Sequence, residues 1–270
     1  MDEVLRAVAA HGLTAPPSSG VVVDDHQVDA LLRAGAAHKL LGLLDQAVAD
    51  GLVVGEPPVL DVIRAKAVRA AAGCLLVERH LLAVHDLLEA GSVPHRFLKG
   101  AAVAHRFHAH AGLRTFVDVD VLVPDDHLDD AVDRLLGAGH LRLQPDPAPA
   151  FTRRFAKSVT VRDRDGVEVD VHRVIADGPF GLRSGSQPLW TRPPASLDLG
   201  GSVVPVLDPV AAFVQACANA VASYDRVGLA ALRDVAQIGA AVAGAADEVD
   251  HLASALALRP CVADAVQRAR

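Results

Sequence analysis

Cysteine is scarce in this chain of 270 residues, which contains only Cys74, Cys217 and Cys261. Three is an odd number and the spacings match no zinc-binding motif, so we expect buried thiols in a reducing cytoplasm and no disulfide bonds. Long apolar runs are also missing, since none approaches the roughly 20 residues that a membrane span requires. The first residues, MDEVLRAVAA, lack the basic lead and the apolar stretch of a signal peptide. These absences predict a cytoplasmic protein with no membrane partner.

Lysine is scarce as well, because only four of the 26 basic residues are lysines, at positions 39, 66, 99 and 157. The chain uses arginine wherever a generic positive charge is enough, so Lys99, directly before Gly100, invites a specific explanation. The net charge of −7 disfavours a broad electrostatic footprint for polymeric nucleic acid, although a small basic pocket could still hold one nucleotide. We therefore expect the partner to be a small molecule or a protein.

Apolar residues are abundant, and a hydrophobic content of 51% is ample for a packed core. Residues 1–90 repeat apolar positions at spacings of three and four, which predicts a helical N-terminal region broken by GEPP at 55–58 and ended by Gly91. Residues 91–204 mix helical and strand-like stretches and predict an α/β or α+β core. Residues 205–270 return to a helical pattern and predict a helical C-terminal region.

Within the core, the clearest strand is LRTFVDVDVLV, residues 113–123. The stretches FTRRFAKSVTVRD (151–163) and GVEVDVHRVI (166–175) are strand-like and meet around RDRDG, which predicts a hairpin. DDHLDDAVDRLLGAGH, from 125 to 140, predicts an amphipathic helix with acidic residues at its start. We expect residues 177–204, which are rich in glycine, serine and proline, to be largely loop.

The strand LRTFVDVDVLV carries two carboxylates, Asp118 and Asp120, on one face, while its valines project from the other. Two charges held this close in a partly desolvated site would repel each other. A bound divalent metal ion between them would resolve the conflict. The alternative is an exposed strand whose polar face happens to be acidic, so the meaning of the pair depends on its neighbours.

Those neighbours suggest a phosphate site beside clustered carboxylates. Lys99 and Gly100 end a short strand and open a helix, so the free N–H groups of its first turn could receive a phosphate. Farther along, VEVDVHRV offers Glu168, Asp170 and His172 on one face of a strand, and Asp170 could complete a cluster of three carboxylates. This layout suits metal-assisted phosphoryl or nucleotidyl transfer.

Four stretches, FLKGAAVAHRF, GLRTFVDVDVLV, LLGAGH and VEVDVHRVI, resemble the uncharacterised nucleotidyltransferases of the DNA polymerase β-like superfamily, a group found widely in bacteria. The resemblance covers roughly residues 75–175 and extends more weakly to the helical tail. It depends on the joint occurrence, in the right order, of K-G, R-x-x-x-D-x-D and D-x-H, none of which would be specific alone. The protein is therefore expected to be bacterial.

The resemblance implies an α+β fold with a polymerase β-like core, in which a short mixed sheet is flanked by helices. It implies Mg²⁺ and a nucleoside triphosphate donor, with ATP expected first, on the open face of the sheet. Gly100 and Ala101 would lie in the phosphate-binding turn, Asp118 and Asp120 would be the metal-binding and catalytic pair, and Asp170 would be the third carboxylate.

Two positions depart from the superfamily pattern. Gly100-Ala101 replaces the usual Gly-Ser or Gly-Gly, which removes a hydroxyl contact to phosphate but leaves the backbone donors, and Asn219 stands where the tail often carries histidine.

Several flanking residues keep alternative interpretations. Lys99 could pair with the β- or γ-phosphate or be a surface lysine at a strand end, and Arg114 could fork onto a phosphate or onto Asp118 itself. Glu168 competes with Asp170 for the role of third carboxylate, and His172 is expected to form a hydrogen bond near Asp170. We expect the histidines of HRFHAH, at positions 105, 108 and 110, to lie on an exposed helix end rather than in a transition-metal site.

The leading hypothesis is a magnesium-dependent nucleotidyltransferase that moves a nucleoside monophosphate from the triphosphate to a small-molecule hydroxyl or a protein side chain, with release of pyrophosphate. One alternative is a non-catalytic relative that keeps the fold as a nucleotide-binding or regulatory module, and another is metal-dependent phosphohydrolysis with water as acceptor. The helical flanks could wall the acceptor pocket or form a homodimer surface. The chemistry of the acceptor pocket is generic in this sequence, so the acceptor stays open.

Overall fold

The computed structural model describes residues 2–13, 20–145, 151–221 and 228–270. The N-terminal region contains helices α1 (Asp2–Ala10), α2 (Asp25–Ala37) and α3 (Leu41–Ala49). Asp24 caps α2, because its side chain accepts from the backbone N–H groups of His26 and Gln27. The strands β1 (Val21–Val22) and β2 (Val53–Val54) form a short parallel pair that the sequence did not predict.

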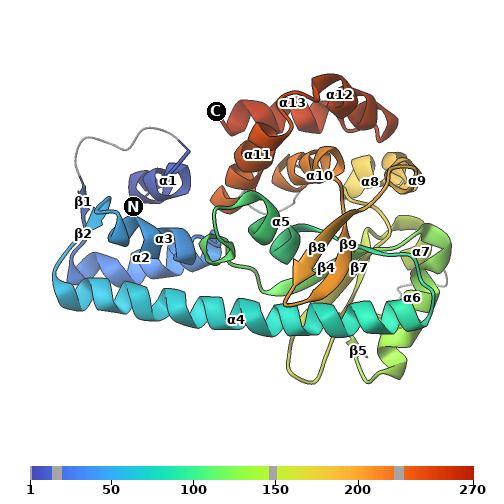
Figure 1. Cartoon of the computed structure of the whole chain (residues 1–270), viewed down its shortest axis with the longest axis horizontal. Helices are drawn as coiled ribbons and strands as arrows, with labels where there is room; N and C mark the ends of the chain where they lie inside the picture. The colour runs from blue at the N-terminus through green and yellow to red at the C-terminus, as the bar shows by residue number, and fades with distance from the viewer. Residues whose placement is uncertain (1, 14–19, 146–150, 222–227) are drawn as a thin grey trace.

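A single long helix, α4 (Pro57–Ala90), underlies the whole molecule and runs beneath both the N-terminal region and the sheet (Figure 1). Proline is favourable in the first turn of a helix, so the two prolines of GEPP begin α4. The same motif also separates α4 from the N-terminal segment before it. Gly91 occupies the C-cap as expected, but the left-handed conformation falls on the next residue, Ser92, at φ 55°.

The core is a mixed sheet of seven strands in the order β5-β6-β7-β4-β3-β9-β8. β4 pairs in parallel with β7 and antiparallel with β3, which pairs in parallel with β9. The strands are β3 (Arg96–Phe97), β4 (Asp118–Leu122), β5 (Leu141–Arg142), β6 (Ser158–Arg162), β7 (Glu168–His172), β8 (Ala195–Leu199) and β9 (Ser202–Val206).

Helices flank both faces of this sheet. Short ones connect the strands: α5 (Lys99–Phe107), the 3₁₀ turns η1 (Ala111–Leu113) and η2 (Asp125–His127), α6 (Leu128–Gly137), α7 (Phe151–Phe155), α8 (Gly178–Ser184) and α9 (Gln187–Trp190). The C-terminal region folds into α10 (Pro209–Val221), α11 (Leu229–Ala241), α12 (Ala246–Ala255) and α13 (Arg259–Arg268), which lie across the sheet from α4 (Figure 1). The predicted α+β fold, a mixed sheet flanked by helices, is confirmed.

Two local predictions within the core were wrong. Residues 151–155 form the short helix α7, so the predicted strand begins only at Ser158. Residues 177–204 are not largely loop, because they contain α8, α9, β8 and most of β9, and β9 carries the sheet on to Val206. Buried Leu197 and Leu199 alternate with exposed neighbours, and Gly200 and Gly201, both at positive φ, close the hairpin. The surrounding prolines hid this alternation.

Three hydrophobic clusters hold the elements together. The first joins the C-terminal half of α4 and α6 to one face of the sheet, and the second packs the C-terminal helices against the other face. The third lies in the N-terminal region but also takes in Leu113 of η1 and Ala230 of α11. All three cysteines are buried and free, as predicted. No helix in the described part of the chain combines the length and apolar character needed to cross a membrane.

Candidate active site

The sheet register decides which side chains meet at the centre of the molecule. Asp120 of β4 lies opposite Asp170 of β7, and Asp118 lies opposite Glu168. Val119 and Val121 point into the core on the α4 side, so the aspartates face the side where α5 and α10 lie. One ligand atom each of Asp120, Asp170 and His172 lies within 4.8 Å of the others. Asp118 is next along the same strand but outside that group.

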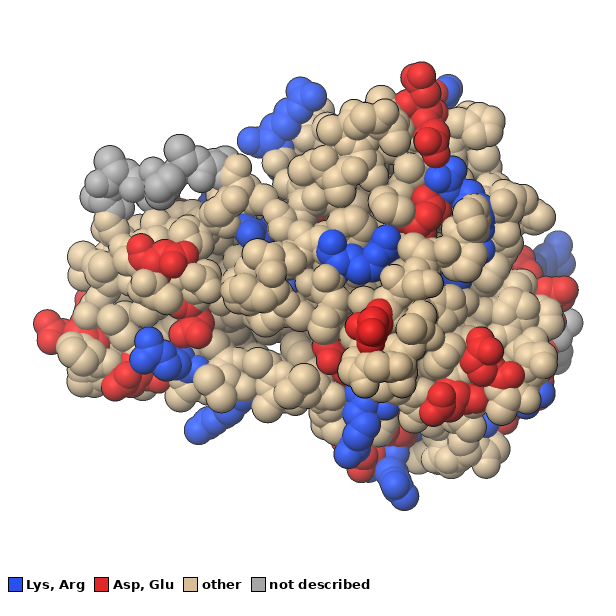
Figure 2. All heavy atoms as spheres, viewed as in Figure 1, with Lys and Arg blue, Asp and Glu red and all other residues tan. Residues whose placement is uncertain are grey.

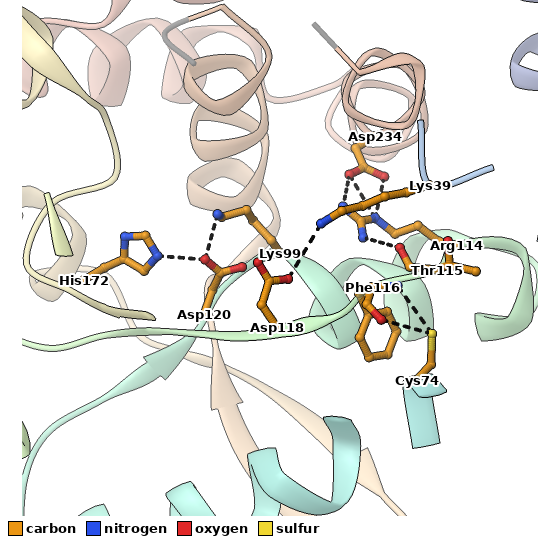
Figure 3. A network of polar contacts seen from close by, with 10 residues as sticks. All are labelled: Lys39, Cys74, Lys99, Arg114, Thr115, Phe116, Asp118, Asp120, His172 and Asp234. Carbon is orange, nitrogen blue, oxygen red and sulfur yellow. Dashed lines mark hydrogen bonds and ion pairs between the residues drawn. The ribbon is translucent and has the colours of Figure 1, made fainter. Parts of the chain in front are cut away.

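Asp120 is buried and held by two partners on one oxygen (Figure 3). Lys99 Nζ and His172 Nε2 each donate to Asp120 Oδ1 at 2.7 Å. Burial alone would raise the pKa of Asp120, but the charge of Lys99 and the hydrogen bond from His172 outweigh it and hold the pKa well below its usual range. Asp120 is therefore an anion at neutral pH, and neither Lys99 nor His172 bonds its second oxygen.

Lys99 lies in the turn between β3 and α5, as predicted, but its ammonium group is bound to Asp120. Burial would lower the pKa of Lys99, and the charge of Asp120 outweighs it, so the pKa lies above its ordinary value and the group stays protonated. The side chain is 17% exposed, which excludes the interpretation of Lys99 as an ordinary surface lysine. A triphosphate arriving at this turn would compete with Asp120 for the ammonium group.

Gly100 has φ 38° and ψ −120°, a backbone conformation that glycine adopts readily and other residues do not. A Cβ added here would lie about 3.7 Å from heavy atoms of Phe116 and Asp118, an ordinary contact distance, so the backbone conformation rather than lack of space favours glycine. Ala101 is buried in the sheet core, so any contact of Ala101 with a phosphate has to come from its backbone amide. A phosphate-binding role for these two residues stays a prediction.

Asp118 has a partner that the sequence analysis missed. Lys39, from the turn between α2 and α3, places Nζ 3.7 Å from Asp118 Oδ1 (Figure 3). The scarcity of lysine was the one sequence signal that could have pointed to Lys39. Each aspartate of β4 thus faces a lysine of its own, one from the core and one from the N-terminal region.

Asp170, rather than Glu168, faces the centre of the site. The hydroxyl of Thr160, opposite Asp170 on β6, donates to Asp170 Oδ1 and leaves the other oxygen open. Glu168 is bound instead by Arg162 at the exposed edge, at 2.5 Å. Asp170 is therefore the better placed third carboxylate.

His172 forms the hydrogen bond that was expected near Asp170, and its partner is Asp120, which lies opposite Asp170 in the sheet. In the parallel register His172 lies opposite Leu122, and from there its ring donates a hydrogen bond to the Asp120 carboxylate. Asp170 accepts a hydrogen bond from Thr160 instead. Burial lowers the pKa of His172 and Asp120 opposes this only in part, so the ring is neutral near pH 7. His172 Nδ1 is buried and has no hydrogen-bond partner among the described residues.

Arg114 is placed differently from the expected phosphate or Asp118 contact. Its guanidinium forks onto Asp234 of α11, with Nε and Nη2 at 3.0 and 2.8 Å from Asp234 Oδ2, and donates to the carbonyl oxygen of Thr115. The side chain is only 6% exposed, and it fixes α11 to the segment that leads into β4. In this arrangement Arg114 supports the site rather than facing a ligand.

His108 also reaches Asp234, with Nε2 at 3.4 Å, and its side chain is fully buried. The prediction that the HRFHAH histidines lie on an exposed helix end is therefore wrong for His108, because the C-terminal helices cover it. His105 forms a hydrogen bond with Glu78 of α4, with Nε2 2.7 Å from Glu78 Oε1.

The donor set fits a hard divalent cation. Asp118, Asp120 and Asp170 offer carboxylate oxygens, which Mg²⁺ and Mn²⁺ prefer, and one oxygen of Asp120 and one of Asp170 are not held by Lys99, His172 or Thr160. Beside them lies the glycine turn that carries Lys99. Carboxylates together with a glycine turn and a positive charge suit metal-assisted phosphoryl or nucleotidyl transfer.

The comparison with known families agrees with this chemistry. The chain belongs to the family described as uncharacterised nucleotidyltransferase, whose sequence profile matches residues 24–270. The resemblance drawn from the K-G, R-x-x-x-D-x-D and D-x-H motifs is thereby confirmed, and nucleotidyl transfer is the general activity that the family supports.

Solved structures similar to this chain are distant. A crystal structure of the lincosamide antibiotic adenylyltransferase LnuA with lincomycin bound is 14% identical, with a TM-score of 0.39 and a match covering 60% of this chain and 95% of that one. An antigenic nucleotidyltransferase-like protein from Paracoccidioides brasiliensis is 17% identical, with a TM-score of 0.39 and coverage of 69% and 92%. No curated protein sequence matches. None of these likenesses identifies a substrate.

Proposed function

We propose that this protein is a magnesium-dependent nucleotidyltransferase that uses a nucleoside triphosphate, with ATP the first to test, and transfers its nucleoside monophosphate to a hydroxyl of a small molecule or a protein side chain. The observation that carries the proposal is the pairing of Asp120 with Asp170 across β4 and β7, beside Asp118 and the Lys99-Gly100 turn. A net charge of −7 and the interspersed acidic and basic side chains on the face drawn in Figure 2 favour such acceptors over polymeric nucleic acid.

In this mechanism Asp118, Asp120 and Asp170 hold the metal, which when bound supplies charge neutralisation at the triphosphate. The acceptor oxygen forms a bond to the α-phosphorus while the bond to the bridging oxygen of the β-phosphate breaks, and pyrophosphate leaves. The proton of the acceptor hydroxyl passes to the free oxygen of Asp170, whose other oxygen Thr160 holds. Neutral His172 keeps one oxygen of Asp120 in place by hydrogen bonding.

Gly100 and Ala101 present their backbone to the phosphates, and Lys99 adds a point charge close to them. The N-terminal and C-terminal helices border this face and are where we place the acceptor pocket. We expect the protein to act in the cytoplasm, and a homodimer is compatible with its helical flanks.

One observation favours the alternative of a non-catalytic nucleotide-binding module. Lys39 pairs with Asp118 and Lys99 with Asp120, and the same pairs would balance these carboxylates in a protein that performs no metal chemistry. The two functions differ in turnover, so an assay of product formation separates them.

The first test is thermal melting with ATP, GTP, CTP or UTP plus Mg²⁺, in which the accepted triphosphate should raise the melting temperature. Incubation with the labelled triphosphate and candidate acceptors should then release pyrophosphate. Asp118→Ala and Asp120→Ala should abolish that release, while Asp61→Ala, an exposed position on α4, serves as a charge-matched control. Nucleotide binding without turnover would support the non-catalytic module, and release of free phosphate would indicate hydrolysis.

A further inference from the structure

The few lysines of this chain are concentrated around the candidate site. Lys39 pairs with Asp118, Lys99 with Asp120, and Lys157 with Asp177 at 3.1 Å, where its charge also acts on His172. Lys66 lies on an exposed part of α4. A lysine ammonium is a compact point charge on a flexible stem, which can exchange one anionic partner for another more readily than a forked arginine. The site therefore uses the residue type that is suited to changing partners.

The backbone at Lys39 supports a functional role. Among the described residues, four that are not glycine have positive φ, namely Lys39, Ser92, Lys99 and Ala257. Two of these four are the lysines that face the aspartate pair. Lys39 follows α2 with φ 57°, a conformation at which glycine is the usual residue. A lysine in such a conformation motivates a functional hypothesis for its side chain.

The turn that carries Lys39 is docked firmly on the segment leading into β4. Gly42, at the start of α3, packs so closely on η1 that an added Cβ would lie 1.8 Å from the carbonyl oxygen of Gly112. Leu41 and Leu113 are buried in the same hydrophobic cluster. The position of Lys39 over Asp118 is thus set by packing between the N-terminal region and the core.

The Lys39 pair is the looser of the two. Its atoms are 3.7 Å apart with side chains 38% and 28% exposed, whereas Lys99 and Asp120 are 2.7 Å apart and more buried. An exposed pair is weak and is easily displaced by a stronger charge. Breaking the Lys39–Asp118 pair therefore costs little free energy, so Asp118 can bind a metal ion instead. The freed ammonium group of Lys39 would then lie beside the incoming triphosphate.

We propose that Lys39 is an exchangeable counterion, which neutralises Asp118 in the metal-free protein and moves to the triphosphate when the metal and nucleotide bind. The N-terminal region thereby contributes a residue to the active site. This inference rests on the proposed function, because it requires both a metal and a triphosphate.

The test compares Lys39→Met with Lys66→Met, which removes the same charge from an exposed helix. Binding of Mn²⁺ without nucleotide is measured by electron paramagnetic resonance of the free ion, and binding of a non-hydrolysable ATP analogue with Mg²⁺ by calorimetry. Lys39→Met should bind Mn²⁺ roughly three- to tenfold more tightly and the analogue roughly tenfold more weakly, while Lys66→Met stays close to wild type. Damage to the fold would weaken both, so opposite changes exclude a merely structural role.

Gly42→Ala provides a second variant, which keeps the lysine but forces the turn away from η1. It should shift both affinities in the same directions as Lys39→Met, with circular dichroism confirming that it is folded. If wild-type protein binds Mn²⁺ and the analogue but Lys39→Met behaves like Lys66→Met, the inference is overturned and the proposed function survives. If wild-type protein binds neither Mn²⁺ nor the ATP analogue, the inference about Lys39 and the proposed function are both wrong.

Discussion

At the scale of single residues, two lysine ammonium groups offset the repulsion between the two aspartates of β4. Asp120 and Lys99 form a buried pair, while Asp118 and Lys39 form a more exposed one. Asp170 instead accepts a hydrogen bond from the neutral hydroxyl of Thr160.

The first prediction concerns the third carboxylate. Asp170→Asn should lower the rate of pyrophosphate release by about 10²–10⁴-fold, because the amide can neither accept the proton nor hold the metal as a carboxylate does. Glu168→Gln should change the rate by no more than a few fold, since Glu168 pairs with Arg162 at the exposed edge. Steady-state kinetics of both variants would decide the matter, and a larger effect at Glu168 would reverse the assignment.

How much of the site the sequence predicts can be seen residue by residue. The alternation of valine and aspartate places Asp118 and Asp120 on one face of a strand, and the K-G dipeptide locates the turn before α5. These are local patterns. The ion-pair partners of the site residues, by contrast, lie far away in the sequence. The sequence does not tell which acidic residue pairs with Arg114, because the packing of α11 is what brings Asp234 to it. The same holds for Lys39, which reaches Asp118 through the docking of a different region.

At the scale of elements, the same substitution should have opposite effects at two glycines. Gly100→Ala should destabilise the protein by about 1–3 kcal/mol, because alanine is strained at φ 38° and ψ −120°, and it should weaken nucleotide binding. Gly73→Ala, in the exposed middle of α4, meets nothing within 4 Å and should stabilise by roughly 0.5–1 kcal/mol through helix propensity. Urea denaturation measures the change in free energy of unfolding for both variants. A Gly100→Ala variant more stable than wild type would contradict the strained backbone conformation described for this turn.

The attachment of α11 to the site should depend on pH. Burial would raise the pKa of Asp234, but the charge of Arg114 outweighs it and lowers the pKa below the ordinary value of 3.8. A depressed folded-state pKa gives stability that is complete above the unfolded pKa and is lost as the pH falls through the folded one. Asp234→Asn should therefore lower the free energy of unfolding by roughly 3 kcal/mol at pH 7. The difference in free energy of unfolding between wild type and the variant should become smaller below about pH 4.

Urea denaturation of wild type and Asp234→Asn at pH 7 and pH 3.5 provides this comparison. Asp264→Asn, which removes an exposed carboxylate that pairs with Arg268 on α13, is the control and should change little at either pH. A constant difference between wild type and Asp234→Asn across this range would mean that the carboxylate charge does not stabilise the attachment.

Sequence patterns at this scale predicted helices better than sheet edges. The long apolar periodicity of α4 and the C-terminal helices is a strong local signal, whereas β8 and β9 are short and carry Pro205. β3 is only two residues long and is stabilised by β4 and β9 on either side, contacts that no local window contains. Strand pairing of this kind follows from the tertiary fold.

At the scale of the whole molecule, the three hydrophobic clusters share elements and should unfold together. α4 contributes to the first and third clusters, and Arg233 of α11 donates at 2.7 Å to the carbonyl oxygens of Ala9 and His11. We expect a single denaturation transition, in which fluorescence of Trp190, the one tryptophan, and far-ultraviolet circular dichroism change together. Two separated transitions would show that the N-terminal region is an independent unit.

The burial of every cysteine has a practical consequence for labelling. Burial raises the pKa of the Cys217 thiol to about 12 and also raises those of Cys74 and Cys261, so alkylating reagents should react slowly with the native protein. A cysteine introduced at an exposed position such as Val22 or Val203 would then be the only rapidly modified thiol. A fluorophore or spin label on Val22→Cys would test whether the N-terminal region moves against the sheet as nucleotide enters, without removing any native residue of the site.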